Sequence, residues 1–309
     1  MSGSGKIVVL GVFVADTAYR AERAPRMGET ILGNSFALGP GGKGSNQAAA
    51  IGRLGGDVSL ITRLGDDAFA DLAEKTWNWA GVTSAASRHP ESYTGAAYIF
   101  IEEATGNNAI IVCPGAATEI GVEDIESNEA LIASASVFIT QLEQPIPAAR
   151  RALEIARGAG VTTILNPAPA APLGDAIYKL CDYVTPNETE AEELTGMPVT
   201  NVEEARKAAD ALLAKGVKNA LITLGEQGAL LHNSSMSDLV PAFDIGTVVE
   251  TTGAGDAFNG GFAVGLAQKL SPLDAVRLGC ATAGISVTRP GTAPSMPTMQ
   301  EVQELLRGQ

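Results

Sequence analysis

The sequence predicts an α/β fold with a doubly wound, mostly parallel sheet, helices on both faces of the sheet and a small β-sheet lid. Two observations carry this prediction. Short β-branched runs alternate with helical patterns along most of the 309 residues, as expected of a parallel sheet that helices cover on both sides. Two stretches interrupt this alternation with strand patterns and turn residues. We therefore expect one domain over residues 1–309, with lid insertions at about 13–40 and 94–113.

The predicted core elements follow one another along the chain. A continuous apolar run over residues 6–12 predicts the first strand, and a helix starts near Lys43. A strand at 58–62 precedes a helix at 67–80, which ends at Gly81 because glycine is a common helix stop. Later strands are predicted at 137–140, 162–165, 183–185 and 220–223, and residues 256–287 are mostly helical.

The two insertions are predicted from their strand patterns. Residues 30–38 form a strand of the first insertion, and strands at 96–101 and 108–112 flank the turn Thr105-Gly106-Asn107 in the second. Segments so far apart in sequence can meet as one small sheet. Beside a ligand crevice such a sheet would be a lid, and the alternative is a surface hairpin without a role.

Composition limits the classes of function. A chain of 309 residues, 45% hydrophobic and 18% charged, can bury a large core. The net charge of −14 repels nucleic acid. No apolar run approaches the ~18 to 20 residues that cross a bilayer, and no secretory signal is evident, so we expect a cytoplasmic protein without a membrane partner. The three cysteines include no CxxC pair, which predicts reduced thiols.

The strongest motif is a glycine-rich turn that leads directly into an apolar helix, residues 250–261. Gly253 and Gly255 let the N–H groups of Gly253, Ala254 and Gly255 converge on an anion at the helix N-terminus. Asp256 follows in the first turn, where a carboxylate can simply cap the helix. Phosphoryl transfer to an alcohol needs both an anion hole and a base, so the combination favours Asp256 as the catalytic base.

A second glycine-rich stretch, residues 39–47, also opens a helix. It is not a Walker A loop, because Gly44 rather than Ser or Thr follows Lys43, and Ala37 stands where the first glycine should be. We interpret it as a polyol site in which glycine backbone admits a sugar ring, while Lys43 and Asn46 offer hydrogen-bond donors. A dehydrogenase is excluded because no G-x-G-x-x-G follows the first strand.

Two further clusters each follow a predicted strand. Asn187 and Glu190, three residues apart, lie on one side of a first helical turn, either as a capping box or close to Mg²⁺-bound phosphates. Residues 223–228, with two glycines, either admit a nucleotide or form a tight turn.

These clusters, together with Asp16 and the segments at 141–143 and 166–169, resemble the ribokinase-like carbohydrate kinase family in content and in order. The resemblance covers essentially the whole chain. It implies ATP-dependent phosphorylation of the 5-hydroxymethyl group of a pentose, ribose to ribose 5-phosphate. It also implies ATP and Mg²⁺ as cofactors and a homodimer formed through the lid. Other sugars or nucleosides, and a non-catalytic sugar sensor, stay open as alternatives.

The resemblance also assigns site residues. The predicted sugar contacts are Asp16, Gly42, Lys43, Asn46, Glu143 and Asp256. The predicted nucleotide contacts are Asn187, Thr223, Gly225, Gly228 and Gly255, with Cys280 near the adenine. Glu190 matches the family's metal-and-phosphate glutamate.

Two positions depart from the family pattern. Val14 stands where ribokinases typically carry Asn, and deoxyribokinases are similar in having an apolar residue there, so 2-deoxyribose is an alternative substrate. Glu250 stands where many members have Asp in a potassium site. Its extra methylene shifts the carboxylate by ~1.5 Å and puts potassium activation in question. The other predicted residues of that cation loop are Thr252, Ser286, Arg289, Gly291 and Ser295.

Overall fold

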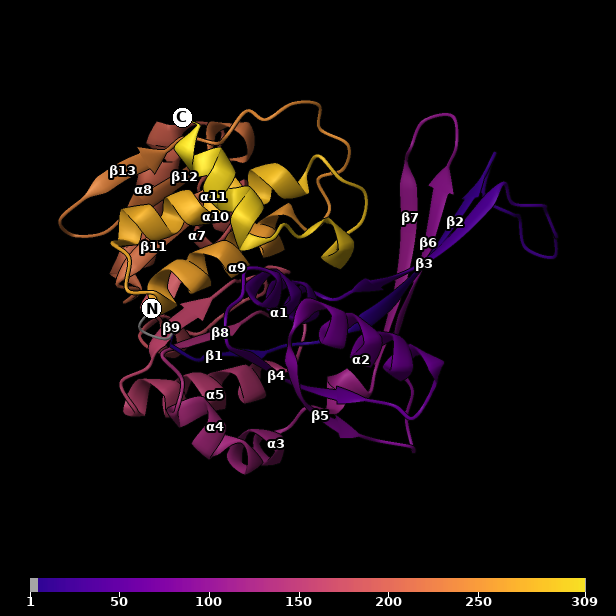
Figure 1. Cartoon of the computed structure of the whole chain (residues 1–309), viewed down its shortest axis with the longest axis horizontal. Helices are drawn as coiled ribbons and strands as arrows, with labels where there is room; N and C mark the ends of the chain where they lie inside the picture. The colour runs from indigo at the N-terminus through magenta and orange to yellow at the C-terminus, as the bar shows by residue number, and fades with distance from the viewer. Residues whose placement is uncertain (1–4, 309) are drawn as a thin grey trace.

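The computed structural model describes residues 5–308 and contains two sheets (Figure 1). The larger sheet has nine strands in the order β13-β12-β11-β10-β9-β8-β1-β4-β5. Its parallel strands are β1 (Ile7–Leu10), β4 (Val58–Leu64), β5 (Thr83–Arg88), β8 (Val137–Thr140), β9 (Thr162–Leu165), β10 (Tyr183–Val184) and β11 (Asn219–Thr223). At one edge β12 (Ala229–His232) and β13 (Ser237–Val240) are antiparallel. The predicted mostly parallel sheet is confirmed.

Helices cover both faces of this sheet (Figure 1). Because side chains alternate along a strand, Ile7 and Val9 of β1 join one buried cluster, and Val8 and Leu10 join the other. The first cluster packs against α1 (Lys43–Arg53), α2 (Ala68–Ala80), α9 (Ala254–Ala267), α10 (Pro272–Ser286) and α11 (Met299–Arg307). The second packs against α3 (Val122–Ser127), α4 (Glu129–Ala133), α5 (Ile146–Gly158), α6 (Asp175–Tyr178), α7 (Glu188–Thr195) and α8 (Val202–Ala214). The chain is therefore doubly wound, as predicted.

Local sequence signals account for the bounds of helix α2. The Asp67 carboxylate accepts hydrogen bonds from the N–H groups of Phe69 and Ala70 at its start, and Gly81 adopts a left-handed conformation with φ 80° at its end. The prediction of a helix over 67–80 is confirmed. Among residues 5–308, no helix is long and apolar enough to span a bilayer.

The two predicted insertions meet in one four-stranded sheet of order β3-β2-β6-β7. Its strands are β2 (Val14–Ala21), β3 (Ser35–Gly41), β6 (Thr94–Glu102) and β7 (Asn108–Gly115). The predicted strand at 30–38 is wrong in its bounds, because β3 begins only at Ser35. The Arg20 carbonyl accepts the Asn34 N–H, and pairing with β2 stops there, so the exposed residues before Asn34 have no strand to pair with.

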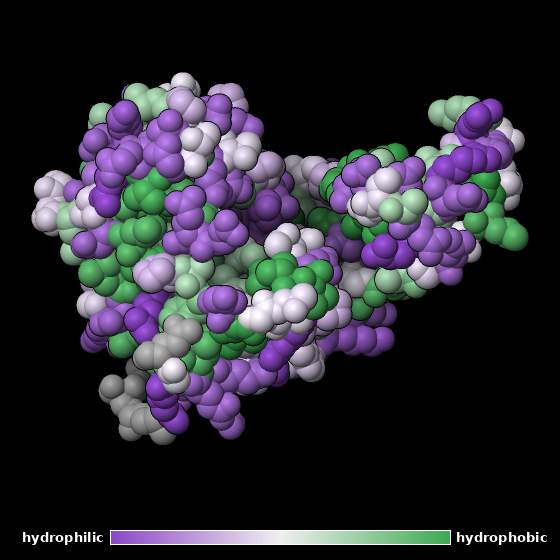
Figure 2. Space-filling view, turned by 90° about the horizontal axis from the view of Figure 1, so that it is seen from above, coloured by the Kyte–Doolittle hydropathy of each residue, from purple (hydrophilic) through white to green (hydrophobic). Residues whose placement is uncertain are grey.

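The small sheet projects from the body of the molecule (Figure 1). It is attached close to β1 and α1, because β2 follows β1 in the chain and β3 leads into α1. In the space-filling view of Figure 2 a hollow lies between the body and the projecting sheet. The 3-10 turns Ala116–Glu119, Gly225–Gln227 and Ala293–Ser295 complete the chain.

Candidate active site

Most of the sequence motifs meet at one edge of the large sheet, where its parallel strands end. Gly11 follows β1, Gln141 follows β8, Asn166 follows β9 and Thr185 follows β10. β1 and β8 are neighbours in the sheet. The chain leads from β1 to α1 and from β8 to α5, and these two helices pack on opposite faces of the sheet. Such a switch point leaves a crevice outside the carboxyl ends of the strands, which is where open α/β sheets bind ligands.

Helices α1 and α9 pack against each other at this edge, and one glycine sets how closely they approach. A Cβ atom on Gly260 would lie 2.5 Å from the Cβ of Ala50 and 3.2 Å from the carbonyl oxygen of Gln47, so a larger residue would push the helices apart. The close approach brings Asn46 and Gln47, in the first turns of α1, within hydrogen-bonding distance of Asp256 in the first turn of α9.

The Asp256 carboxylate is buried and does not cap its helix. Its Oδ2 accepts a hydrogen bond from Asn46 Nδ2 at 3.0 Å, and its Oδ1 accepts one from Gln47 Nε2 at 3.0 Å. Burial raises the pKa of Asp256, whereas the Lys43 ammonium and the two amide donors favour the charged form. The capping alternative is thus not the geometry found here.

No side chain caps the glycine turn before Asp256, although the Ala254 N–H donates to the Thr251 carbonyl at 3.1 Å. Gly253 lies at the N-cap of α9 with φ 82°, a left-handed conformation that glycine adopts readily, and no side chain hydrogen-bonds to this helix start. A Cβ atom on Gly255 would meet no atom within 4 Å, so the space beside Gly255 is open. The N-terminus of a long helix with open space and a carboxylate can hold an anion close to a base.

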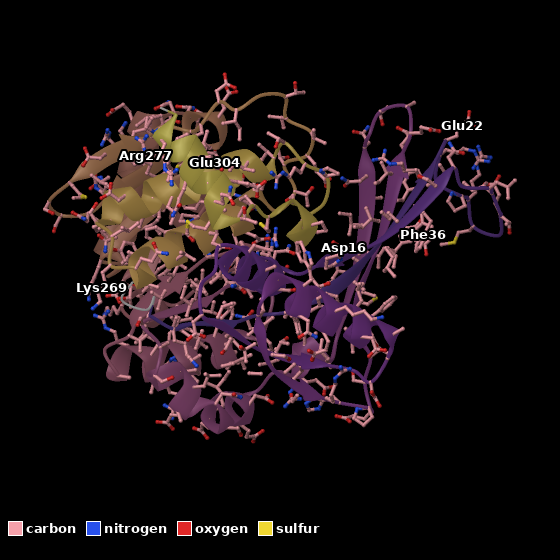
Figure 3. All side chains as sticks on the ribbon, viewed as in Figure 1. Asp16, Glu22, Phe36, Lys269, Arg277 and Glu304 are labelled. Atoms are coloured by element: carbon pink, nitrogen blue, oxygen red, sulfur yellow. The ribbon has the colours of Figure 1, made fainter. Side chains whose placement is uncertain are left out.

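Two further carboxylates, Glu143 and Asp16, belong to this site. Glu143 Oε2 accepts the backbone N–H of Lys43 at 2.7 Å. Burial, with smaller contributions from the charges of Asp256 and Asp16, raises the pKa of Glu143 to about 7, although the Lys43 charge opposes the shift. Burial raises the pKa of Asp16 to about 6. Figure 3 shows Asp16 where the small sheet joins the body, so both parts of the molecule contribute to this acidic cluster.

Glycines admit the Asp16 carboxylate and position the start of α1. A Cβ on Gly41 would lie 2.2 Å from Asp16 Oδ2, and one on Gly42, which has φ 87°, would lie 2.5 Å from the Val12 carbonyl oxygen. Val14 lies on the same face of β2 as Asp16, two residues away, and is only 7% exposed. The predicted sugar contacts are therefore neighbours in space.

The predicted nucleotide contacts surround the ends of β10 and β11. The Thr223 N–H donates to the Pro186 carbonyl, which places the 223–228 turn beside Asn187. Asn187 and Glu190 form the capping box that was one of the two alternatives, with Glu190 Oε2 accepting the Asn187 N–H at 2.9 Å. Burial raises the pKa of Glu190, the Lys43 charge lowers it and the Asp256 charge raises it.

The remaining predicted nucleotide contacts have strained or buried positions. Gly225 and Gly228 adopt φ values of 51° and 105°, and a Cβ on Gly228 would lie 2.0 Å from the Val240 carbonyl oxygen. Cys280, buried in α10, has its Sγ 4.0 Å from the same carbonyl, and burial raises the pKa of its thiol to about 12. These contacts place Cys280 behind the same turn as Gly228.

The predicted cation loop is held by its own hydrogen bonds. Glu250 Oε2 accepts the Gly291 N–H at 2.8 Å, which joins the segment before Gly253 to the loop after α10. Ser286 and Ser295 donate their hydroxyl protons to the Ala283 and Thr292 carbonyls. The Arg289 side chain pairs with Glu301, and Thr252 directly precedes Gly253. Within residues 5–308 no three His, Cys, Asp or Glu side chains gather as they would around a metal ion.

Behind Asp256 lies a set of buried polar residues for which no role was predicted from the sequence. Gln47, Gln141, Asn166, Thr185 and Asn259 are each at most 6% exposed and hydrogen-bond to one another or to Asp256. Gln47, Gln141 and Asn166 lie in segments that the sequence had already singled out, and Asn259 is a polar residue inside the apolar helix α9, which is the other signal that could have pointed to them.

Comparison with known proteins gives the family. Residues 4–299 match the model of the pfkB family carbohydrate kinases. The chain belongs to the pfkB carbohydrate kinase family. It is 37% identical to the ribokinase of Haemophilus influenzae over 301 residues, which are 97% of this chain and 98% of that one. It is 36% identical to the deoxyribokinase of Salmonella typhi, over 97% of this chain and 98% of that one. This pfkB member is therefore a ribokinase-type sugar kinase, and the alternative of a non-catalytic sensor is set aside.

Solved structures of a ribokinase and of a nucleoside kinase share this fold. The ribokinase of Arabidopsis thaliana, solved with ribose and ATP, superimposes with a TM-score of 0.93 at 31% identity, over 98% of this chain and 99% of that one. The predicted resemblance and fold class are confirmed. A nucleoside kinase of Methanocaldococcus jannaschii, at 20% identity and a TM-score of 0.82, shares the fold.

Proposed function

We propose that this kinase phosphorylates the 5-hydroxymethyl group of a pentose with ATP, ribose to ribose 5-phosphate. One observation carries the proposal: a buried carboxylate, Asp256, is held by two amide donors at the open N-terminus of α9. A helix start can stabilise the charge of a transferring phosphoryl group, and the carboxylate beside it can accept a proton. The ribokinase relatives use the substrate class that this arrangement suits.

The chemical step needs little beyond these groups. The sugar hydroxyl oxygen bonds to the γ-phosphorus of ATP, its proton passes to the Asp256 carboxylate, and the bond from phosphorus to ADP breaks. The N–H groups of Gly253, Ala254 and Gly255 stabilise the negative charge on the transferring group. Burial of Asp256 raises its pKa and makes it a stronger base, while the Lys43 ammonium keeps it charged.

The proposed sugar site consists of Asp16, Gly42, Lys43, Asn46 and Glu143 beside Asp256. Asn46 supports it, because its Oδ1 is buried and accepts no hydrogen bond within residues 5–308. An unsatisfied buried acceptor costs about 1 to 3 kcal/mol, which a sugar hydroxyl would recover. Asp16 and Glu143 add acceptors for further hydroxyl groups.

The proposed nucleotide site consists of Asn187, Thr223, Gly225, Gly228 and Gly255, with Cys280 behind it. For Mg²⁺ the residues fit a loose site, in which Glu190 would supply a carboxylate and the ATP phosphates and waters the other ligands. Bound Mg²⁺ would neutralise phosphate charge.

A monovalent cation would bind at the loop of Thr252, Ser286, Arg289, Gly291 and Ser295. We expect weaker potassium activation than with Asp at position 250, because the Glu250 carboxylate already accepts the Gly291 N–H.

A second substrate, 2-deoxyribose, is favoured by two observations. Val14 offers no hydrogen bond at the position beside Asp16, and the deoxyribokinase of Salmonella typhi is nearly as similar to this chain as the ribokinase of Haemophilus influenzae.

We further propose that the enzyme works in the cytosol, where ATP is available and its three free cysteines stay reduced. Its net charge of −14 favours no nucleic-acid partner.

The small sheet supports a homodimer. Tyr19, Phe36 and Tyr98 stack on one of its faces, with ring centroids 5.1 and 5.4 Å from Tyr19, and all three are more than a third exposed. Exposed aromatic clusters of this kind are typical of protein interfaces. We propose that a second copy of the chain covers this face.

Substitution of Asp256 tests the proposed reaction. We expect Asp256→Asn to fold normally, to bind sugar and to lower kcat by ~10² to 10⁴, the usual contribution of a positioned base. ADP release with ribose, 2-deoxyribose, arabinose, fructose and nucleosides measures both the loss and the preferred sugar. A kcat within about threefold of wild type would remove Asp256 from the mechanism.

A further inference from the structure

Behind the proposed base lies a layer of buried amides that takes no direct part in the proposed phosphoryl transfer. Gln47 lies at its centre and is 0% exposed. Its Nε2 donates to Asp256 Oδ1 at 3.0 Å and to Asn166 Oδ1 at 3.0 Å, and its Oε1 accepts from Gln141 Nε2 at 2.6 Å. Both N–H groups and the carbonyl of this side chain are therefore engaged.

We propose that Gln47 is a positioning residue, which orients the Asp256 carboxylate for the phosphoryl transfer by donating a hydrogen bond to its charged form. The proposal rests on the proposed function, because it takes Asp256 as the base. It concerns how the base is held, and it adds a residue to which neither the family motif nor the sugar contacts assigned a role.

The donor and acceptor atoms of its neighbours allow the Gln47 amide only one orientation. Asn166 donates its own Nδ2 to the Thr185 carbonyl at 2.9 Å, so its Oδ1 is the atom that faces Gln47. If the Gln47 amide turned over, its oxygen would lie against the oxygens of Asp256 and Asn166, and its NH₂ group would face the Gln141 NH₂ group. Both contacts are repulsive, so the neighbours fix a donor toward Asp256.

The network also reaches the turn before Asp256. Thr185 donates its hydroxyl to Asn259 Oδ1 at 2.7 Å, and Asn259 Nδ2 donates to the Gly255 carbonyl at 2.8 Å. The carboxylate and the peptide unit that precedes it are thus tied to the same set of amides. A carboxylate with one donor on each oxygen cannot rotate without losing a hydrogen bond.

Charged groups from several elements act on Asp256 together with Gln47. Lys43 of α1 favours the carboxylate, while Glu143, after β8, and Glu190 of α7 carry like charges. Asp16 of β2 acts on Glu143 in the same cluster. Because burial favours the protonated form of Asp256 and the Gln47 hydrogen bond favours the charged form, loss of this donor should move the proton uptake of Asp256 to higher pH.

Asn46 and Gln47 should differ in what they affect. Asn46 retains a free Oδ1, so its substitution should change both the sugar KM and kcat. Gln47 has no exposed surface and cannot contact the sugar. Its substitution should change kcat and the pH dependence of kcat while leaving the sugar KM nearly unchanged.

The test compares Gln47→Glu with Gln144→Glu in the full-length enzyme. Gln144 is also buried, but its Nε2 donates to Thr140 Oγ1 and to the Gln141 carbonyl rather than to Asp256. We measure the melting temperature, the KM for ribose, and kcat between pH 5 and 9. For Gln47→Glu we expect a KM within about threefold of wild type and a kcat at pH 7 that is lowered about 10- to 100-fold. We also expect the acidic limb of the kcat–pH profile, which is the fall in kcat on acidification, to lie about one pH unit higher than in wild type. For Gln144→Glu we expect an unmoved limb.

An unmoved limb in folded Gln47→Glu, or a limb that moves equally in Gln144→Glu, would overturn the proposal. If Gln47→Glu does not fold, Gln47→Met removes the same donor without adding charge, and the limb should still rise. Asp256→Asn is measured in parallel. Turnover retained in Asp256→Asn refutes the proposed base itself, whereas an inactive Asp256→Asn with an unmoved Gln47 limb refutes only this inference.

Discussion

Asp16, Glu143 and Asp256 are three carboxylates that share one site with the Lys43 ammonium. Burial raises the pKa of each, that of Asp16 to about 6 and that of Glu143 to about 7. In the ligand-free protein these groups lose hydration without gaining enough hydrogen-bond donors. Sugar hydroxyls are donors, so a ligand would stabilise the charged forms. Such shifts cluster at functional sites, and here they have consequences for stability that can be measured.

Glu143→Gln should stabilise the ligand-free protein at high pH. Burial raises the Glu143 pKa from near 4.5 to about 7, so between these values the folded state holds a proton that the unfolded state has released. By linkage, this contribution to stability falls as the pH rises through that window. A neutral glutamine avoids the loss, and we expect a gain of about 1 kcal/mol at pH 8 that largely disappears at pH 5.

Urea unfolding without sugar at pH 5 and pH 8 measures this difference, with sugar affinity measured alongside. We expect the same substitution to weaken sugar binding. A variant that loses more stability at pH 8 than at pH 5, relative to wild type, would contradict the argument from burial.

Val14 is the residue that we expect to discriminate between ribose and 2-deoxyribose. Since Val14 shares the Asp16 face of β2 and offers no hydrogen bond, a hydroxyl there stays unpaired. A missing partner is worth ~1 to 3 kcal/mol, or roughly 5- to 150-fold in specificity. We expect 2-deoxyribose to be used at least comparably with ribose, and Val14→Asn to shift the ratio of kcat/KM values toward ribose.

Val14→Ala is the matched control, since it removes contact area without adding a partner and should not favour ribose. A wild-type enzyme that prefers ribose a hundredfold, with no shift in Val14→Asn, would show that position 14 does not read the hydroxyl.

At the scale of elements, the crossing of α1 and α9 determines whether the site exists. Gly260 allows the two helices to approach until a Cβ would touch Ala50, and this distance brings the amides of Asn46 and Gln47 to Asp256. The strands contribute differently, since their carboxyl ends supply polar residues from β8, β9 and β10 to the same edge.

Gly260→Ala should therefore impair both stability and activity. Its Cβ would lie 2.5 Å from that of Ala50, and forced separation of packed helices costs typically about 1 to 3 kcal/mol. The control is Gly158→Ala at the end of α5, where a Cβ would meet nothing within 4 Å. Urea unfolding and kcat measure the effect. Equal stability of the two variants would show that α1 and α9 tolerate the separation.

At the scale of the whole molecule, the small sheet and the body meet at the proposed sugar site. In Figure 3 Asp16 lies at the junction, and Phe36 and Glu22 lie farther out along the projecting sheet. One face of this sheet carries Val14 and Asp16, while the opposite face carries Tyr19, Phe36 and Tyr98. The sheet can therefore close on a ligand with one face and meet a second copy with the other.

Sugar binding should close this sheet over the site, because phosphoryl transfer to an alcohol must exclude water that would hydrolyse ATP. We expect amide hydrogen exchange in β2, β3, β6 and β7 to slow at saturating sugar. Exchange in α8, which packs against β11 and β12, should stay the same. Unchanged exchange in all four strands would leave the sheet as a dimer contact without a role as a lid.

The sequence alone predicted the fold class, the family and several elements with their observed bounds. Strands at 137–140 and 162–165 and the helix bounded by Asp67 and Gly81 are as predicted. Periodicity, capping residues and the order of glycine motifs are local properties, so they can be read along the chain. The local strand pattern was weak at the start of β3, and β5, β12 and β13 were not predicted. In these strands pairing with neighbouring strands decides the bounds.

Only the tertiary structure decided which polar residues act together. Gln47 and Asp256 are 209 positions apart, and nothing in the local pattern around Gln47 distinguishes a buried amide from an exposed one. Asn187 and Glu190 show the converse, since a capping box and a phosphate site share one spacing in sequence, and the structure was needed to show that the capping box forms. Burial and charge depend on elements that the fold brings together from distant parts of the chain. The proposed base, its amide partners and the raised pKa of Asp256 therefore emerge only when α1 packs against α9.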